Sequence, residues 1–544
     1  MSPSTKNRLV KVPRRKRKGP RTFIPRLLCS TLSTEPMPEL GTILVTGASG
    51  YIGGRLVPEL LARGYRVRVM VRGAEEVVHE RWKECEVIVA DAHDRESLKP
   101  ALEGVYAAYY LIHSLLLGPE DFERADILAA RNFRDVAEEL GVRRIIYLGG
   151  IGDTHASSSR HLRNRMAVAE ELCNGQVPVT ALRAAIIIGS GSASFEIVRG
   201  LVEKMRVLPV PKWAENRCQP IGVGDVIRYL VGVLETPILR AQAFDIGGKD
   251  VLTYRAMLSE FARLLQKRIV YIRSPVSDIR LHSYIASLIT PVPESIIECL
   301  FEGLKDEVVC RDEEIRKFVM FEPLSYRGAL ARALTREQQD LVRTRWSDAY
   351  PPAHELAMKL SELTDGADFI ASFSMESEKP AAALFMSVCQ IGGRMGWFHS
   401  SWMWRIRGAL DKLFFGVGVV RGRKSEKHLS KDDVIDFWRV EDLVEDKRLL
   451  LRAEMKVPGR AWLDFKIEEV EPDAATPSEA ASITGTAEHS EQQRIATGPG
   501  SLRRLTATAY FDTKTFLGRL YWYVLAPFHG YIFRDLVSQL ERRA

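Results

Sequence analysis

The sequence predicts an α/β doubly wound parallel sheet, followed by an α+β domain with a curved antiparallel sheet and a long C-terminal helix. In the first half, short β-rich runs alternate with helical patterns, and the runs are almost wholly apolar, as in parallel strands buried on both faces. From residue 434 onwards, apolar and polar residues alternate within the runs, which is typical of strands with one buried face. With 544 residues, 46% of them hydrophobic, the chain can fill two cores.

The first sheet is expected to contain strands separated by helices, and right-handed crossovers between them would produce the Rossmann arrangement. The expected strands cover residues 42–47, 65–73, 85–91, 105–114, 142–150 and 177–189. The expected helices cover residues 51–64, 119–141 and about 160–173.

A glycine-rich segment, TGASGYIGG, follows the first strand and opens the first helix. Gly47 would permit the tight turn, Gly50 would let the backbone approach a pyrophosphate, and Gly53 would let helix and strand pack closely. The free amides and positive dipole end of the helix would then hold the phosphates. The residues expected to contact the dinucleotide are Gly47, Ser49, Gly50, Tyr51, Ile52, Gly53, Arg72, Asp91, Ala92 and Arg165.

The end of the second strand bears on which dinucleotide is bound. NAD binding usually uses an acid there, whereas this chain has Arg72, which can pair with a 2′-phosphate. NADP(H) is therefore favoured and NAD(H) is the alternative, with Arg72 then a plain surface residue. Asp91 and Ala92, after the third strand, are expected near the adenine, unless Asp91 merely caps the next helix.

The segments TGASGYIGG, VIVADAHD, YLGGIG and LRAAIIIGSG together resemble the atypical or extended short-chain dehydrogenase/reductases of the NmrA-like kind, over roughly residues 40–335. The resemblance implies hydride transfer with a nicotinamide cofactor, a Ser or Thr after the fifth strand and a Tyr-x-x-x-Lys pair on the next helix. In this chain the strand ends in Gly149 and Gly150, His161 stands at the Tyr position and Arg165 stands at the Lys position.

Two histidines are the candidate proton partners. His161 and His113 could exchange a proton near neutral pH, and Arg165 could hold the nicotinamide ribose. The alternative is that His161 is a partly exposed helix residue without a catalytic role. In the stretch 188–205, serines 190, 192 and 194 are expected either to contact substrate or to serve as turn residues.

The second domain is expected to carry strands at 434–443, 448–459, 461–471 and 503–513, and a helix at 515–541 with a kink at Pro527. A curved sheet closed by a C-terminal helix resembles the helix-grip fold of START-like lipid-binding proteins. It resembles more closely an uncharacterised domain that follows NmrA-like domains.

Seven of the nine tryptophans lie after residue 345, most densely in the segment 395–416. Such a cluster can fill an ordinary core, line an apolar ligand cavity or seat a helix at a membrane surface.

The first 39 residues are expected to form a disordered basic tail, because residues 1–34 hold ten Lys or Arg and no acid. Without the tail, basic and acidic residues nearly balance, so no nucleic-acid partner is expected. Seven scattered cysteines indicate a reducing compartment and no metal site. The expected location is the cytoplasm, or an organelle matrix if the tail is a transit peptide. The rest divides into a first domain at 40–335, a linker at 336–365 and a second domain at 366–544 with a disordered insertion at about 472–501.

The sequence therefore predicts an NAD(P)H-dependent oxidoreductase that acts on a hydrophobic carbonyl or quinone-like substrate. The alternative is a non-catalytic NAD(P)H-binding sensor or accessory protein, like the NmrA-type sensors or the Rossmann accessory subunit of respiratory complex I. In both interpretations the C-terminal domain is expected to bind an apolar ligand.

Overall fold

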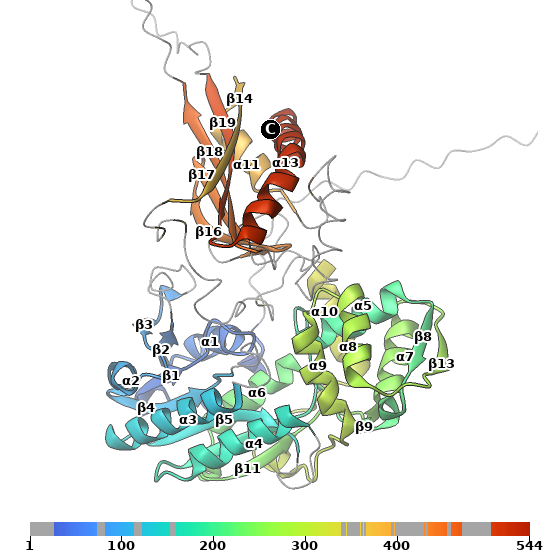
Figure 1. The fold of residues 1–544 in the computed structure, drawn as a ribbon. Helices are drawn as coiled ribbons and strands as arrows, with labels where there is room; N and C mark the ends of the chain where they lie inside the picture. Colours follow the sequence, from blue (N-terminus) through green and yellow to red (C-terminus); the bar gives the residue numbers. More distant parts are fainter. Residues whose placement is uncertain are drawn as a thin grey trace, which may run out of the picture.

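The structure is a computed structural model. It describes residues 27–72, 82–113, 122–152, 159–338, 366–392, 433–453, 458–470 and 502–544, together with Thr344, Leu360, Leu363, Trp397 and Leu429. Figure 1 shows a parallel sheet with its helices, a mainly helical lobe beside it, and the antiparallel sheet of the C-terminal half with helix α13 along it. No helix in these described ranges combines the length and apolar character that a membrane-spanning segment needs.

The N-terminal sheet has seven parallel strands in the order β11-β6-β5-β4-β1-β2-β3. They are β1 (Thr42–Val45), β2 (Arg66–Val71), β3 (Glu86–Val89), β4 (Val105–Tyr110), β5 (Arg144–Gly150), β6 (Val179–Ala184) and β11 (Ala243–Ile246). The doubly wound sheet that the sequence predicts is thereby confirmed. Strand order reverses between β1 and β4, so the loops after these two strands diverge and leave a crevice at the carboxyl edge of the sheet.

Helices cover both faces of this sheet, as its two-sided apolar strands require. Helices α1 (Gly53–Ala62) and α6 (Val223–Leu234) bury their apolar residues in the core on one face. Helices α2 (Arg95–Leu102), α3 (Phe122–Glu139) and α4 (Arg160–Cys173) do so on the other.

A second lobe extends from the carboxyl edge of the sheet. The run 177–189, expected as one strand, is divided: β11 ends at Ile246, so the residues after Ala184 lose that partner, and β7 (Ile187–Ile188) pairs with β10 (Ile221–Gly222) instead. The lobe also contains α5 (Ala193–Lys204), β8 (Val207–Val210), β9 (Arg217–Cys218), β12 (Leu252–Thr253), α7 (Tyr254–Leu264), β13 (Val270–Arg273), α8 (Ile279–Ile289), α9 (Glu294–Glu302) and α10 (Tyr326–Gln338).

The end of the expected disordered tail is ordered, which corrects that prediction for residues 27–39. The backbone amides of Leu28 and Cys29 each donate to a carboxylate oxygen of the buried Glu59 at 3.0 Å. Both side chains are buried in the core beside α1 and α6. The apolar pair and its two charge-assisted hydrogen bonds outweigh the chain entropy that the basic composition alone suggested. Residues 1–26 lie outside the described ranges.

The C-terminal sheet is antiparallel, in the order β14-β19-β18-β17-β16-β15. The strands are β14 (Phe369–Ser377), β15 (Val434–Ile435), β16 (Trp438–Val444), β17 (Arg448–Ala453), β18 (Arg460–Glu469) and β19 (Arg503–Asp512); the helices are α11 (Ala381–Val388) and α13 (Phe516–Arg543). The four expected strand regions and the long helix are confirmed. The sequence did not predict β14 and α11, and the expected insertion lies outside the described residues.

The described tryptophans of this half lie in its interior. Trp397, Trp438, Trp462 and Trp522 are buried, and the first two belong to the core that α11 and α13 form with the sheet. These four therefore match the ordinary-core interpretation of the aromatic cluster. Most of the segment 395–416 lies outside the described residues.

Candidate active site

The glycine-rich loop lies at the crevice between β1 and β4, and two of its glycines are required sterically. Gly47 has φ +59°, and a Cβ there would lie 2.7 Å from the carbonyl oxygen of Leu111. A Cβ on Gly53 would lie 2.3 Å from the carbonyl oxygen of Gly47. The tight turn and the close helix–strand packing expected from the sequence are both present. In the first turn of α1, the amides of Gly54 and Arg55 donate to the carbonyl oxygens of Gly50 and Ile52, each at 3.0 Å.

A buried arginine that the sequence analysis missed braces this loop. The Arg55 guanidinium donates to the carbonyl oxygens of Ser190 at 2.7 Å and Thr344 at 3.0 Å, and lies 4.6 Å from the ring centre of Tyr51. The Tyr51 hydroxyl also reaches the carbonyl oxygen of Ser190, at 3.3 Å. These bonds tie the loop to the start of the second lobe. Ser190, expected as a substrate contact or turn residue, here supplies a structural carbonyl group.

A cavity of about 350 Å³ begins at this loop and runs along the carboxyl ends of β4, β5 and β6. Tyr51 and Ile52 line its nucleotide end, and His113, His161 and Arg165 also line it. The structure thus brings together the residues that the sequence proposed for the nicotinamide end.

His161 and Arg165 lie one turn apart on α4 and both line the cavity, as their spacing predicts. The Arg165 guanidinium donates to the carbonyl oxygen of Leu148, and to that of Ile112 at 3.4 Å, and it lies 4.9 Å from the ring centre of Tyr147. Part of its donor capacity is therefore used to hold the ends of β4 and β5 together.

The two candidate histidines are neighbours. The ring centres of His113 and His161 are 5.1 Å apart. His113 Nδ1 lies 3.2 Å from Oδ2 of the buried Asp126, which also accepts a hydrogen bond from Asn164 at 2.8 Å. Sequence reasoning missed Asp126 and Asn164. Each could have been recognised in the sequence as a polar residue on the side of its helix that faces the sheet, Asp126 on α3 and Asn164 on α4.

The environment keeps both imidazoles neutral at neutral pH. Burial and the charge of Arg165 hold the pKa of His113 below its usual range, although the bond to Asp126 opposes this shift. Burial, His113 and Arg165 hold the pKa of His161 well below its usual range. Nε2 of His113 and Nδ1 of His161 are buried and meet no hydrogen-bond partner among the described residues. These two nitrogens are therefore left unsatisfied by the described residues, and both histidines line the cavity.

The glycines that end β5 explain why no serine stands there. A Cβ on Gly149 would lie 2.8 Å from Cε1 of the buried Tyr147, and one on Gly150 would lie 3.0 Å from Cδ2 of Leu162. A Ser or Thr at either position would force a core side chain to move. Any proton-transfer chemistry here must therefore come from other residues.

At the adenosine end the structure describes the expected residues without bringing them into this cavity. Arg72 is exposed directly after β2, and Ala92 is buried after β3. Asp91 accepts hydrogen bonds from the His93 backbone amide at 3.0 Å and its Nδ1 at 2.9 Å. Burial by itself would raise the pKa of Asp91, but these two hydrogen bonds outweigh it and hold the pKa below its usual value. Asp94, not Asp91, caps α2.

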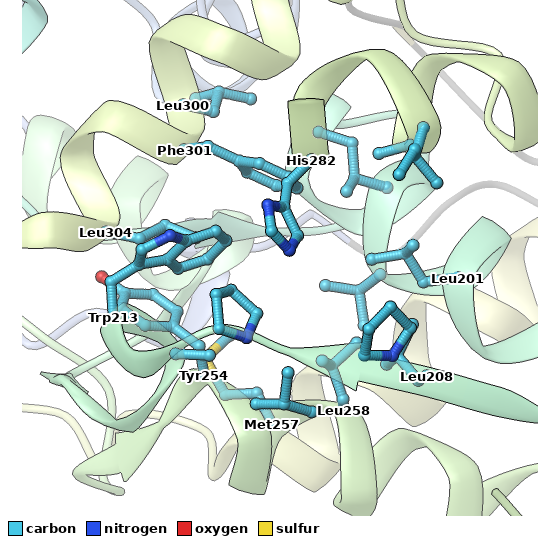
Figure 2. A pocket seen from close by; sticks show the side chains of 18 of the residues that line it. Leu201, Leu208, Trp213, Tyr254, Met257, Leu258, His282, Leu300, Phe301 and Leu304 are labelled. Atoms are coloured by element: carbon cyan, nitrogen blue, oxygen red, sulfur yellow. The ribbon is translucent and has the colours of Figure 1, made fainter. Parts of the chain in front are cut away.

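A second, apolar chamber of about 130 Å³ lies beyond the histidines, within the second lobe. Figure 2 shows its wall, with the imidazole of His282 directed inwards between Trp213 and Leu201. Five residues line both hollows: Ile186, Ser194, Tyr254, Leu300 and Leu304. Ser192 caps α5 through the Phe195 amide at 3.2 Å, and it also lines the first cavity. The apolar hollow predicted from the sequence lay in the C-terminal half, and this chamber was not predicted.

Two family comparisons match separate parts of the chain. Residues 47–185 match a family of NAD(P)H-binding domains. Residues 363–536 match a family described only as a protein of unknown function, so the START-like resemblance of that half stays a prediction.

Among characterised proteins, the sterol demethylase protein B of Methylococcus capsulatus is 33% identical over 114 residues, covering 20% of this chain and 35% of that protein. Subunit 9 of the Arabidopsis thaliana mitochondrial NADH dehydrogenase 1 alpha subcomplex is 27% identical over 244 residues, covering 42% of this chain and 60% of that protein. The ceramide reductase of Caulobacter vibrioides is 26% identical over 240 residues, covering 43% of this chain and 74% of that protein. The matches to the first two span only about a third and three fifths of those proteins.

Among solved structures, the triphenylmethane reductase of Citrobacter sp. complexed with NADP(H) is 18% identical, with a TM-score of 0.45, over 54% of this chain and 99% of that one. The seven-stranded sheet, its glycine-rich crevice and the match of residues 47–185 together show an NAD(P)H-binding domain with a Rossmann-type sheet.

Proposed function

We propose that the N-terminal domain is an NAD(P)H-dependent reductase of a carbonyl, enone or quinone-like group carried by an apolar molecule. The observation that carries this proposal is the shared wall of the two hollows. One hollow runs from the glycine-rich loop to His161, and the other is almost purely apolar. A reactive group beside the histidines and an apolar body in the chamber would occupy both.

The crevice fits a dinucleotide on its own chemistry. Gly47 and Gly53 permit the tight turn and the close packing of α1, and the amide of Gly53 at the start of α1 would donate to a phosphate. When bound, the nicotinamide supplies or accepts a hydride. Arg165 would hold the ribose with the donors that its two carbonyl bonds leave free, and Arg72 would pair with a 2′-phosphate, which favours NADP(H) over NAD(H).

His161 would provide the proton for the reduced oxygen. As a neutral imidazole it donates a hydrogen bond that polarises the carbonyl, and it gives a proton to the oxygen as the carbon gains hydride. Solvent then restores the proton to His161. His113, held by Asp126, positions the ring of His161 and helps keep it neutral.

The test uses purified protein, NADPH and a panel of long-chain aldehydes, ketones and quinones, with oxidation followed at the nicotinamide absorbance band. His161→Phe is expected to lower kcat by about 10²- to 10⁴-fold while the NADPH affinity changes by less than about twofold. His161→Gln keeps a hydrogen-bond donor but cannot exchange its proton, so it should recover only part of the rate. Full activity in His161→Phe would remove His161 from the mechanism.

The chain has neither the serine after β5 nor the Tyr-x-x-x-Lys pair on the next helix. This difference favours a second candidate, a non-catalytic NAD(P)H-binding sensor or accessory protein. The match to the Arabidopsis NADH dehydrogenase subunit supports it. Tight NADPH binding without turnover across the panel would establish this alternative. Mass spectrometry of small molecules that copurify with the chain would test whether the C-terminal half also binds an apolar ligand.

A further inference from the structure

We infer that the outer side of the second lobe, around α8, docks on an anionic lipid surface and admits a lipid into the apolar chamber. The admission step rests on the proposed function, whereas the docking step does not. The basis is one helix that forms both a wall of the chamber and an exposed apolar surface.

Helix α8 carries large apolar residues on its outer side. Leu281, Ile285 and Leu288 are exposed by 44%, 36% and 39%, and their spacing puts them on one face. The inner face buries Ser283 and Ala286. A surface helix normally carries polar residues outside, so an apolar outer stripe marks a contact surface.

One residue of this stripe also belongs to the chamber wall. Ile285 lines the chamber and is also exposed, while its neighbours His282 and Ala286 line the chamber as well. The segment that leads into α8 continues the apolar character, with Ile272 and Val276 both exposed. An apolar molecule that leaves a bilayer here would move from one apolar surface to another.

The net positive charge of the same segment favours an anionic partner. Residues 266–289 contain four basic residues and one acid, Asp278, whose carboxylate is already used to accept from the Leu281 amide and cap α8. Arg268 and Arg273 are exposed and form no ion pair with any residue in the described ranges. Exposed apolar residues beside unpaired cations fit the acyl region and the anionic headgroups of a membrane better than a neutral protein surface.

The experiment measures binding of the full chain to vesicles of phosphatidylcholine and phosphatidylserine in a roughly 7:3 ratio, and to pure phosphatidylcholine, by co-sedimentation. We expect binding to the anionic vesicles to weaken about tenfold in Leu281→Asp/Leu288→Asp, and by a similar factor in Arg268→Glu/Arg273→Glu. The matched control, Ile238→Asp/Met320→Asp, changes two exposed apolar residues outside this lobe surface and should bind as the unchanged chain does.

Hydrogen–deuterium exchange locates the contact, because the basic N-terminal segment contributes equally to every variant. Peptides within 270–289 should be protected by anionic vesicles. Unchanged binding in both double variants, or protection confined to the exposed apolar residues of α13, would overturn the proposal. So would a dimer in analytical ultracentrifugation that Leu281→Asp/Leu288→Asp dissolves, because the stripe would then be a subunit interface.

Failure of this inference can be told apart from failure of the proposed function. NADPH affinity and turnover of a short, water-soluble carbonyl, both measured without vesicles, should be the same in the α8 variants and the unchanged chain. Loss of vesicle binding with intact turnover concerns docking alone. Vesicle binding without any turnover leaves docking in place and removes the reductase.

Discussion

Two buried carboxylates of the antiparallel sheet are paired, whereas two buried imidazole nitrogens at the carboxyl edge of the parallel sheet are not. In the antiparallel sheet, Arg448 donates to both carboxylate oxygens of the buried Asp464, each at 2.9 Å, and Trp462 donates to Glu441 at 3.0 Å. Beside the cavity, one ring nitrogen of each histidine, Nε2 of His113 and Nδ1 of His161, meets no partner among the described residues. The paired groups serve the fold, whereas the unpaired nitrogens belong to residues that line a space of about 350 Å³.

The two halves also differ in where their aromatic residues lie, and a dense cluster of tryptophans does not mark the apolar chamber. The sequence concentrates tryptophan in the C-terminal half, yet the described tryptophans there fill the core. The described apolar chamber is lined mainly by aliphatic residues of the second lobe. Aromatic density therefore located a core, and an open chamber formed where helices of ordinary composition meet around a gap.

The largest expected effect is at the glycine-rich loop. Gly47→Ala places a Cβ against the Leu111 backbone at a positive φ, so we expect NADPH affinity to fall about a thousandfold, measured by calorimetry. Gly104→Ala is the control, because Gly104 also has a positive φ, +67°, but no atom within 4 Å of the added Cβ. Equal losses in both variants would mean that backbone strain, and not the loop, controls binding.

The C-terminal half should respond in stability only. Asp464→Ala leaves Arg448 without its buried partner and should lower the free energy of unfolding by about 3 kcal/mol, measured by urea denaturation, with unchanged NADPH affinity. Asp442→Ala removes a more exposed partner of the same arginine, 3.3 Å away, and should cost less than about 1 kcal/mol. A parallel loss of NADPH affinity would show that the two halves are coupled.

Cofactor choice is the next test. Arg72→Gln should weaken NADPH binding about tenfold and leave NADH binding within about twofold, because only NADPH carries the 2′-phosphate. Arg66→Gln, at the other end of β2, should change neither affinity. If Arg72→Gln weakens both cofactors equally, Arg72 does not read the 2′-phosphate.

The smallest expected effect is that of pH on turnover. Because the pKa of His161 is held well below its usual range, the imidazole stays neutral as the pH falls from 8 to 6, so kcat/KM should change by less than about twofold. Any change in kcat/KM caused by protonation of His161 should appear only below that range. A change centred near pH 6.5 would indicate an ordinary, solvated histidine.

Much of the architecture followed from local patterns. Apolar strand runs, helix spacing and the glycines of the loop predicted the parallel sheet, and alternation predicted four strand regions of the second sheet. The prediction missed β14, and it extended β6 through residue 189, because strand ends depend on which partner strands continue alongside. It also assigned residues 27–39 to a disordered tail, since composition does not reveal that Glu59 binds two of their amides.

Sequence alone determined the loop that receives a dinucleotide and the one-turn spacing of His161 and Arg165, because both depend on local backbone geometry. Only the tertiary structure decided that His113 and Asp126 join them, that Arg55 braces the loop, and that an apolar chamber opens beside the histidines. Those features depend on residues far apart in the chain. Their distances, burial and pKa shifts arise only when packing excludes water between them.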